Sequence, residues 1–265
     1  MRKAKKSLGQ NFLRDQNLAR KIAEAGDIQA GDLVLEIGPG EGILTAQILA
    51  RGARVVAVEK DERLCEFLAE KFANQIQSGS LVLVHDDILK LDPLPTSPLA
   101  GRGVPYKLIA NIPYYITGAI LRKFLTAENQ PKQMTLMLQK EVAERIVARN
   151  GRESLLSISV KVFGDPKILF RVWRGAFRPA PNVDSAVLVI ENISRRKFAN
   201  EDLEKKFFEI LRAGFAHPRK KLSSNLSGLL LPKPCFGNFG KMGVGENARA
   251  ENLTLAQWLK LAEML

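Results

Sequence analysis

Short aliphatic runs alternate with helical patterns throughout residues 22–140. The aliphatic runs are rich in Val, Leu and Ile and lack polar alternation, which is typical of strands buried on both faces. The expected strands are 33–38, 54–59, 81–86, 107–111 and 134–138. Repeated strand, helix, strand units predict an α/β fold with a parallel, doubly wound sheet. Such a sheet binds its ligands beyond the carboxyl ends of its strands.

After residue 140 the pattern changes. Residues 154–164 are expected to form a helix that returns the chain to the sheet, and two aliphatic runs, 167–173 and 185–193, predict a final antiparallel pair at the sheet edge. From Arg195 onward the chain consists of amphipathic helical patterns, the last of which opens with a capping box from Thr254 to Gln257. The predicted division is a basic N-terminal arm, a main α/β domain and a small helical domain: 1–21, 22–194 and 195–265.

The formal net charge is +12, and all of the excess lies at the two ends of the chain. Residues 1–21 hold seven Lys or Arg and one acid, residues 22–194 hold 20 of each sign, and residues 195–265 hold 13 against seven. A neutral body with basic ends favours a polyanionic partner such as nucleic acid over a surface that is basic for solubility alone.

Composition also excludes some classes of protein. No apolar run approaches the roughly 18 residues of a transmembrane helix, and the basic start is not followed by the apolar core of a signal peptide. Cys65 and Cys235, with two histidines, are too few for a disulfide framework or a zinc site. We therefore expect a cytoplasmic, globular protein with reduced cysteines, no membrane contact and no metal.

A glycine-rich loop, "EIGPGEG", follows the first expected strand and places Gly38, Gly40 and Gly42 before a helix. A nicotinamide-binding fingerprint has its third glycine one position later, where Ile43 stands. Glu41 would oppose a pyrophosphate, whereas S-adenosylmethionine has no phosphate and carries a cationic sulfonium. The loop alone is equally compatible with tight packing that needs glycine.

Acidic residues follow the next two strands. Glu59 ends the second strand, where a carboxylate can accept hydrogen bonds from both hydroxyls of a ribose. Asp61 and Glu62 are expected to be surface acids. After the third strand, Asp86 and Asp87 are equally good acceptors for an adenine amino group. A magnesium site at these acids is disfavoured because no third acidic ligand is evident.

The segment "NIPYY" ends the fourth strand at the same edge of the sheet. The side-chain oxygen of Asn111 and the carbonyl of Ile112 can accept both hydrogens of an exocyclic amine, which favours a nucleophilic nitrogen. Pro113 fixes the turn, and Tyr114 offers a face for a base to stack on. The alternative is a helix cap, a strand end and core aromatics, and we assign Tyr115 to core packing.

Four motifs occur in this order along the chain: "KKSLGQNFL", "EIGPGEG", "NIPYY" and "FRPAPNVDSAV". Together they resemble the ribosomal RNA adenine N6,N6-dimethyltransferases of the bacterial small subunit, the KsgA type, over nearly the whole chain. The resemblance implies a Rossmann-like class I methyltransferase sheet with a small all-helical C-terminal domain. It implies S-adenosylmethionine as cofactor and 16S rRNA in the immature small subunit as partner, with two adjacent adenosines of the 3′-terminal hairpin each methylated twice at N6.

The resemblance assigns residues to roles and chooses Asp87 over Asp86. With Gly40 added from the glycine loop, the expected cofactor-binding residues are Asn11, Leu13, Gly38, Gly40, Glu59, Asp87 and Asn111. The expected catalytic residues are Asn111, Ile112, Pro113, Tyr114 and Phe177, the last as a second stacking face, although a buried Phe beside Pro also fits plain packing. The expected RNA contacts are Lys3, Lys5, Lys6, Arg219, Lys220 and Lys221.

Other functions stay open at this point. A 23S rRNA adenine N6-methyltransferase shares "NIPY", and a noncatalytic RNA-binding factor of ribosome assembly could keep the same fold. The "VDSAV" segment and the basic helical tail favour the small-subunit enzyme over the 23S rRNA methyltransferase. The intact "NIPY" segment speaks against a noncatalytic RNA-binding factor. A nicotinamide oxidoreductase is the weakest alternative because of the glycine spacing and Glu41. We expect the enzyme to act as a monomer.

Overall fold

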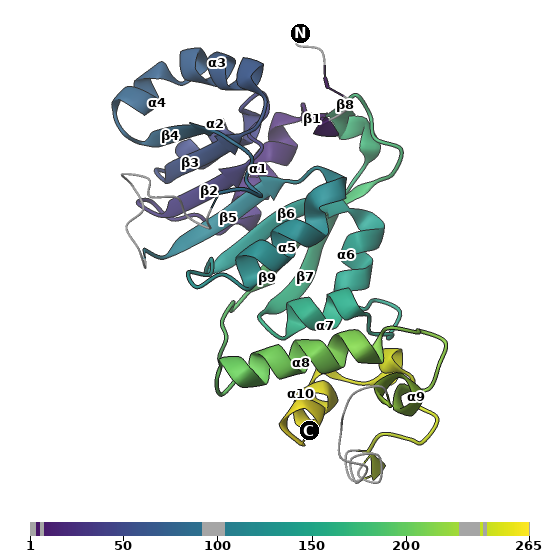
Figure 1. Ribbon diagram of the computed structural model, residues 1–265. Helices are drawn as coiled ribbons and strands as arrows, with labels where there is room; N and C mark the ends of the chain where they lie inside the picture. Colours follow the sequence, from purple (N-terminus) through teal and green to yellow (C-terminus); the bar gives the residue numbers. More distant parts are fainter. Residues whose placement is uncertain (1–3, 6–7, 92–103, 228–238, 241–242, 265) are drawn as a thin grey trace. The chain divides into compact units, whose positions relative to one another are not determined.

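The computed structural model describes residues 4–5, 8–91, 104–227, 239–240 and 243–264 (Figure 1). The chain forms two compact units, Met1–Ala143 with Asp165–Ile193, and Glu144–Gly164 with Ser194–Leu265. The sequence division assigns residues 144–164 to the first unit, but they belong to the second, because Phe163 packs against the rings of Phe198 and Phe208 there. Lys3, Lys6 and Cys235 lie outside the described residues.

Among the described residues, the first unit is built on a seven-stranded sheet (Figure 1). In sheet order the strands are β4 (Leu81–His85), β3 (Arg54–Glu59), β2 (Leu33–Ile37), β5 (Tyr106–Asn111), β6 (Gln133–Gln139), β9 (Ser185–Glu191) and β7 (Asp165–Val172). The first five are parallel to one another, whereas β9 is antiparallel to both β6 and β7. The predicted parallel sheet with a final antiparallel pair is confirmed.

Helices cover this sheet because both of its faces are apolar. The helical segments of the first unit are α1 (Gln16–Ala25), α2 (Ile43–Leu49), α3 (Glu62–Lys71), α4 (Ala73–Gln77), η2 (Tyr114–Ile116), α5 (Thr117–Leu125) and η3 (Arg174–Ala176), and α6 (Lys140–Ile146) begins in it. One buried cluster joins α1, α2 and α3 to strand residues that include Val34, Val55 and Ile109. Leu35 and Leu108 point to the opposite face and are fully buried as well.

A separate two-stranded ribbon joins distant parts of the sequence. The strands β1 (Phe12–Leu13) and β8 (Phe177–Arg178) pair antiparallel, with Phe12 opposite Arg178 and Leu13 opposite Phe177 (Figure 1). The amide of Arg14 extends the ladder by donating to the carbonyl of Ala176 at 3.2 Å. The ribbon therefore anchors the end of the N-terminal arm. The sequence pattern does not predict it.

The second unit contains α7 (Leu155–Lys161), α8 (Glu201–Gly214), α9 (Leu222–Leu226), η6 (Ala250–Asn252) and α10 (Leu255–Met264). The predicted capping box exists, since the amide of Gln257 donates to Thr254 Oγ1 and the amide of Thr254 donates to Gln257 Oε1. Trp258 is fully buried and stacks on Phe215 at 5.5 Å between ring centroids. None of the helices in the described part of the chain has the length and apolarity needed to cross a membrane.

Candidate functional site

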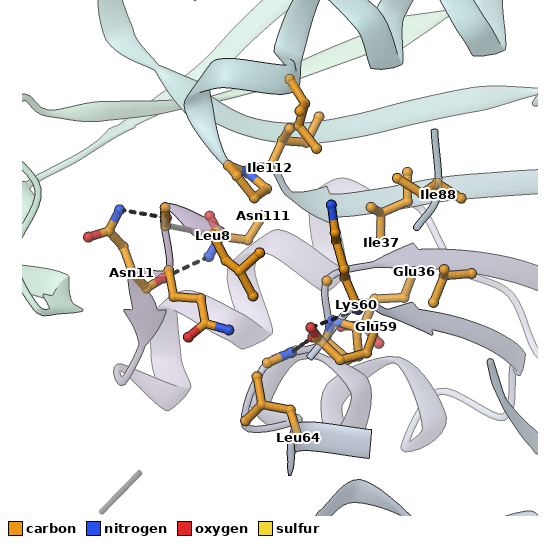
Figure 2. Close-up of a pocket in the computed structure, with 18 of the residues that line it drawn as sticks. Leu8, Asn11, Glu36, Ile37, Glu59, Lys60, Leu64, Ile88, Asn111 and Ile112 are labelled. Carbon is orange, nitrogen blue, oxygen red and sulfur yellow. Dashed lines mark hydrogen bonds between the residues drawn. The ribbon is translucent and has the colours of Figure 1, made fainter. Parts of the chain in front are cut away.

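A pocket lies at the carboxyl ends of β2, β3, β4 and β5 (Figure 2). It encloses about 1160 Å³ of empty space, part of which is open to solvent. Its lining residues are 8–13, 36–41, Ile43, Leu44, 58–60, Leu64, 86–89 and 111–116. All of the predicted cofactor-binding residues are among them, as are Ile112, Pro113 and Tyr114.

The glycine loop forms one wall of this pocket. Gly38 and Gly40 line it with φ of 68° and 59°, a left-handed backbone that favours glycine. A Cβ atom on Gly40 would stand 3.3 Å from the ring of Phe12. Gly42 differs, because a Cβ there would come within 2.6 Å of the ring of Phe72. Two glycines of the motif therefore shape the pocket, and the third permits close packing behind it.

Glu59 joins the glycine loop to the end of β3. One carboxylate oxygen accepts from the amides of Lys60 and Asp61, both at 2.9 Å, and the other accepts from the amide of Gly40 at 3.1 Å. Burial raises the pKa of Glu59, and the three backbone donors oppose that rise. The side chain thus holds the loop in place while facing the pocket.

Glu36 is a buried acid that the sequence analysis missed. It lies on β2, lines the pocket and is 1% exposed, and its Oε2 has no hydrogen-bond partner among the described residues. Burial above all, together with the neighbouring Glu59 carboxylate, raises the pKa of Glu36 to about 8. A carboxyl group in an otherwise apolar strand is costly to bury, and that cost was the available signal in "LVLEIG".

Both acids after β4 reach the pocket. Asp87 accepts from Lys60 Nζ at 2.8 Å and from the amide of Leu89 at 3.0 Å, and the Lys60 ammonium lowers the pKa of Asp87. Asp86 accepts from the amide of Asp87 at 2.6 Å. In the part of the chain that the structure describes, no group of three or more His, Cys, Asp or Glu side chains is placed to hold a metal ion.

The "NIPYY" segment closes the pocket at the end of β5. Asn111 Nδ2 donates to the carbonyl of Asn11 at 3.3 Å, and no described residue donates to Asn111 Oδ1 (Figure 2). The buried Ile112 donates its amide to the carbonyl of Met137 at 3.1 Å. The Tyr114 hydroxyl hydrogen-bonds the buried Ser185 hydroxyl at 2.8 Å, and burial raises the pKa of Tyr114.

Two aromatic residues are placed differently from expectation. Tyr115 is 63% exposed at the pocket, so its assignment to core packing is wrong; its ring lies so close to Gly9 that a Cβ there would stand 3.1 Å away. Phe177 is 5% exposed and does not line the pocket. The β1–β8 ribbon pairs Phe177 with Leu13 and places it in the same buried cluster as Val172.

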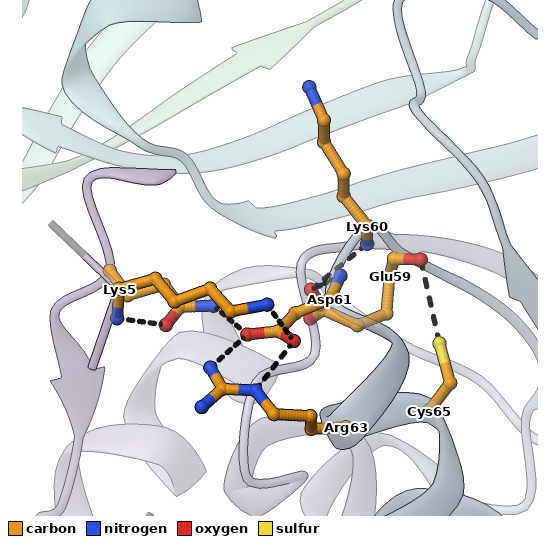
Figure 3. A network of polar contacts seen from close by, with 7 residues as sticks. Lys5, Glu59, Lys60, Asp61, Arg63 and Cys65 are labelled. Carbon is orange, nitrogen blue, oxygen red and sulfur yellow. Dashed lines mark hydrogen bonds and ion pairs between the residues drawn. The ribbon is translucent and has the colours of Figure 1, made fainter. Parts of the chain in front are cut away.

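Asp61 is the second acid whose position the sequence analysis misjudged. It was expected at the surface, but its side chain is fully buried and accepts from Lys5 Nζ and Gln10 Nε2, each at 2.9 Å, and from two nitrogens of Arg63 (Figure 3). The Arg63 guanidinium, with Gln10 and Lys5, holds the pKa of Asp61 well below its usual range. Lys5, predicted to contact RNA, thus forms an ion pair with Asp61, although its side chain is 43% exposed.

This network fastens the N-terminal arm over the pocket. Lys5 and Gln10 precede Asn11, whose carbonyl accepts from the amide nitrogen of Asn111. The Asn11 side chain in turn donates to the carbonyl of Gly9 at 3.2 Å. The arm therefore sets which atom of the Asn111 amide is free. Leu8, Gln10 and Phe12 line the pocket as well, and sequence patterning gave no sign of them.

The family model for ribosomal RNA adenine dimethylases matches residues 1–265. The chain belongs to this family. A ribosomal RNA small subunit methyltransferase A from Dehalococcoides mccartyi is 43% identical over 98% of this chain and 87% of that protein. The protein of the same name from Fusobacterium nucleatum is 35% identical over 99% of this chain and 97% of its own length.

Solved structures of rRNA adenine dimethylase relatives share the fold over both units. The 23S rRNA methyltransferase ErmE has a TM-score of 0.77 and 28% identity, covering 96% of this chain and 98% of its own. A dimethyladenosine transferase from Plasmodium falciparum has a TM-score of 0.78 and 26% identity, covering 94% and 95%. The predicted Rossmann-like class I methyltransferase fold and the predicted family are confirmed.

The dimethylase uses S-adenosylmethionine, and the residues of the pocket fit that cofactor. The acidic and basic side chains of the lining are Glu36, Glu41, Glu59, Asp86, Asp87 and Lys60. An excess of acids, with a buried carboxyl oxygen that has no partner, suits a ligand that is cationic and free of phosphate. The same groups would repel the pyrophosphate of a dinucleotide.

We predict that Asp61→Asn weakens cofactor binding by releasing the arm. Removing the charge that Lys5 and Arg63 share should raise the Kd for S-adenosylmethionine about tenfold to a hundredfold, the range for losing a charged hydrogen bond. Isothermal titration calorimetry measures it. The control is Glu62→Gln, which removes an exposed acid next in sequence and should leave the Kd unchanged. An Asp61→Asn protein with wild-type affinity would contradict the role of the arm.

We predict that Glu36 makes the free protein less stable as the pH rises. Its pKa in the folded state is about 8, above the value of about 4.3 in an unfolded chain, so the folded state holds a proton that the unfolded state loses between these values. Stability should therefore fall by up to about 1.4 kcal/mol per pH unit across that window. The free energy of unfolding, measured with urea from pH 5 to 8, should fall less steeply with pH in Glu36→Gln than in the wild type. Equal pH dependence of the two proteins would contradict the prediction.

Proposed function

We propose that this protein dimethylates N6 of two adjacent adenosines in the 3′-terminal hairpin of 16S rRNA. We further propose that it acts as a monomer, in the cytoplasm, on the immature small subunit. Relatives that carry the small-subunit name over 98% of the chain support the choice of rRNA. The observation that carries the chemistry is the Asn111 amide, which stands at the pocket with its nitrogen engaged and its oxygen free.

In this proposal Asn111 and Ile112 prepare the target nitrogen. The lone pair of an adenine N6 amine is delocalised into the ring, so the amine is a poor nucleophile. Asn111 Oδ1 and the Ile112 carbonyl accept its two hydrogens and favour a tetrahedral nitrogen. The Asn11 carbonyl supports this role because it holds the amide nitrogen on the other side. S-adenosylmethionine supplies the electrophilic methyl group when bound. Catalysis then depends mainly on alignment.

Aromatic side chains hold the flipped base in place. Tyr114 is fixed through its hydroxyl by Ser185, which leaves the ring as a stacking face worth roughly 1 to 3 kcal/mol per base. Tyr115 supplies a second exposed ring at the same pocket. Phe177, proposed from the family resemblance to frame the base, is buried against the arm and supports the site from behind Leu13.

Further residues are proposed for the cofactor and the RNA. Among the described residues, Glu59 Oε2 accepts from one donor, the amide of Gly40, so it retains capacity for a ribose hydroxyl. The proposed acceptor for the adenine amino group of the cofactor is Asp87, with Asn11, Leu13, Gly38 and Gly40 as the surrounding wall. Arg219, Lys220 and Lys221 precede α9, are exposed and form no ion pair with described residues, which supports their proposed contact with rRNA.

The modification assay tests the proposed substrate. Labelled S-adenosylmethionine is incubated with undermethylated small subunits, and the RNA is digested and analysed for modified nucleosides. We expect N6,N6-dimethyladenosine in 16S rRNA at two neighbouring positions. Large subunits serve as the control and should remain unlabelled. Label in 23S rRNA instead would assign the protein to the other rRNA, and no dimethyladenosine in either would refute the proposal.

We predict that Asn111→Ala lowers turnover far more than it weakens cofactor binding. Loss of a catalytic acceptor typically costs about 10² to 10³ in kcat, whereas the cofactor keeps its other partners. Single-turnover methylation gives the rate, and calorimetry gives the Kd for S-adenosylmethionine. Asn74→Ala, at an exposed position of α4, is the matched control and should change neither. Equal losses of rate and affinity would mean that Asn111 serves mainly to bind the cofactor.

A further inference from the structure

A second groove lies next to the cofactor pocket in the first unit. It is lined by Arg14, Asp15, Asn17, Leu18, Lys21, Glu24, Ala25, 169–173, Gly175 and Ala176. These residues come from α1 and the two residues before it, from the edge strand β7 with the following Trp173, and from η3. The groove and the pocket share no lining residue, although Leu13 of the pocket directly precedes Arg14 of the groove. The groove is therefore a separate surface adjoining the site.

Two large apolar side chains of the groove are open to solvent. Trp173 is 76% exposed and Leu169 is 43% exposed. By contrast, Trp258 is fully buried. A tryptophan this exposed forgoes most of its hydrophobic stabilisation, which is typical of a surface that binds a partner.

Unpaired cations surround Trp173. Arg14 and Lys21 line the groove, and Arg174 and Arg178 flank it in sequence. All four are exposed, and none forms an ion pair with another residue in the part of the chain that the structure describes. Guanidinium and ammonium groups without an acidic partner are available to phosphates.

The acids of the groove, Asp15 and Glu24, already have partners within the protein. Asp15 caps α1 by accepting from the amides of Asn17 and Leu18 at 2.8 and 3.1 Å. Glu24 accepts from Arg20 at 2.7 Å and lies 3.6 Å from Arg51. The groove therefore combines an exposed indole with unneutralised positive charge. That combination suits a nucleic-acid strand, whose bases stack on aromatic rings and whose phosphates bind cations.

The β1–β8 ribbon connects the groove to the catalytic pocket. Phe12, which lines the pocket, pairs with Arg178, and Arg14 pairs onward through its amide to Ala176 of the groove. The ribbon therefore joins the two surfaces through backbone pairs, with the exposed Arg178 opposite Phe12.

We propose that this groove binds the RNA strand that flanks the target adenosine, with one base stacked on Trp173 and phosphates on Arg14, Lys21 and Arg174. This inference rests on the proposed function, because it requires RNA as the substrate. It adds a contact surface on the methyltransferase unit itself, distinct from Arg219, Lys220 and Lys221. RNA is favoured over a protein partner because the free cations lie around the exposed ring.

The test compares variants at Trp173. Trp173→Ala should raise the Kd for protein-free, undermethylated 16S rRNA about 5- to 100-fold, and Trp173→Phe should recover most of the affinity because it keeps a ring. The Kd for S-adenosylmethionine should not change. Ile76→Ala removes another exposed apolar side chain, on α4, and is the control. An unchanged RNA affinity in Trp173→Ala would overturn the proposal.

Two further readouts distinguish stacking from a structural effect. The chain has two tryptophans and Trp258 is fully buried, so RNA should quench the solvent-exposed emission in the wild type and not in Trp173→Phe. Arg14→Gln should reduce the slope of log Kd against log salt by about one. Arg54→Gln, an exposed arginine at the amino end of β3, should not. Absence of both effects would also overturn the proposal.

The outcomes separate the two hypotheses. If the groove has no role while wild-type protein still dimethylates 16S rRNA, the proposed function stands and the groove inference fails. If Trp173→Ala weakens binding to assembled subunits but not to protein-free 16S rRNA, the groove binds a ribosomal protein and the RNA inference is wrong. If wild-type protein forms no dimethyladenosine on small subunits, the proposed function fails first.

Discussion

Parallel strands bring their carboxyl ends to one edge of the sheet, and the whole site depends on that constraint. At this edge the amides of Gly40, Lys60 and Asp61 lie beyond the ladder, so another group must satisfy them. Glu59 does so for three amides at once, from the glycine loop and from its own turn. These three hydrogen bonds hold the Glu59 carboxylate in the pocket. The same side chain therefore both stabilises the loop and lines the proposed cofactor site.

The buried charge of Asp61 extends this arrangement to a part of the chain that the sheet does not contain. A carboxylate without solvent must be compensated, and Lys5 and Gln10 of the arm provide part of that compensation with Arg63. Because the arm is drawn in, the carbonyl of Asn11 can orient the amide of Asn111. A charge pair outside the pocket thus helps to set the orientation of the Asn111 amide inside it.

The sequence predicted the elements whose signal is local. Buried aliphatic runs gave the strands, and "EIGPGEG", Glu59 and "NIPYY" marked the carboxyl ends of strands, because each of these patterns spans only a few residues. Asp61 and Phe177 were harder to place, since their burial depends on partners about 50 and 160 residues away in sequence. Tyr115 was assigned to the core on residue type alone, but the short η2 turn directs it outward. Glu36 was missed, although an acid within an otherwise apolar strand was itself a local signal.

The basic N-terminal segment shows why charge counts need structure. Its cations looked equivalent in the sequence, yet Lys5 is bound to Asp61 and Arg20 to Glu24. Arg14 and Lys21 have no such partner among the described residues and lie beside the exposed indole of Trp173. A cation that is already paired with an acid of the protein interacts less with a polyanion. A cation without such a partner contributes fully to counterion release. Among the described cations of the arm, the two without an ion-pair partner therefore both line the groove that we propose for RNA.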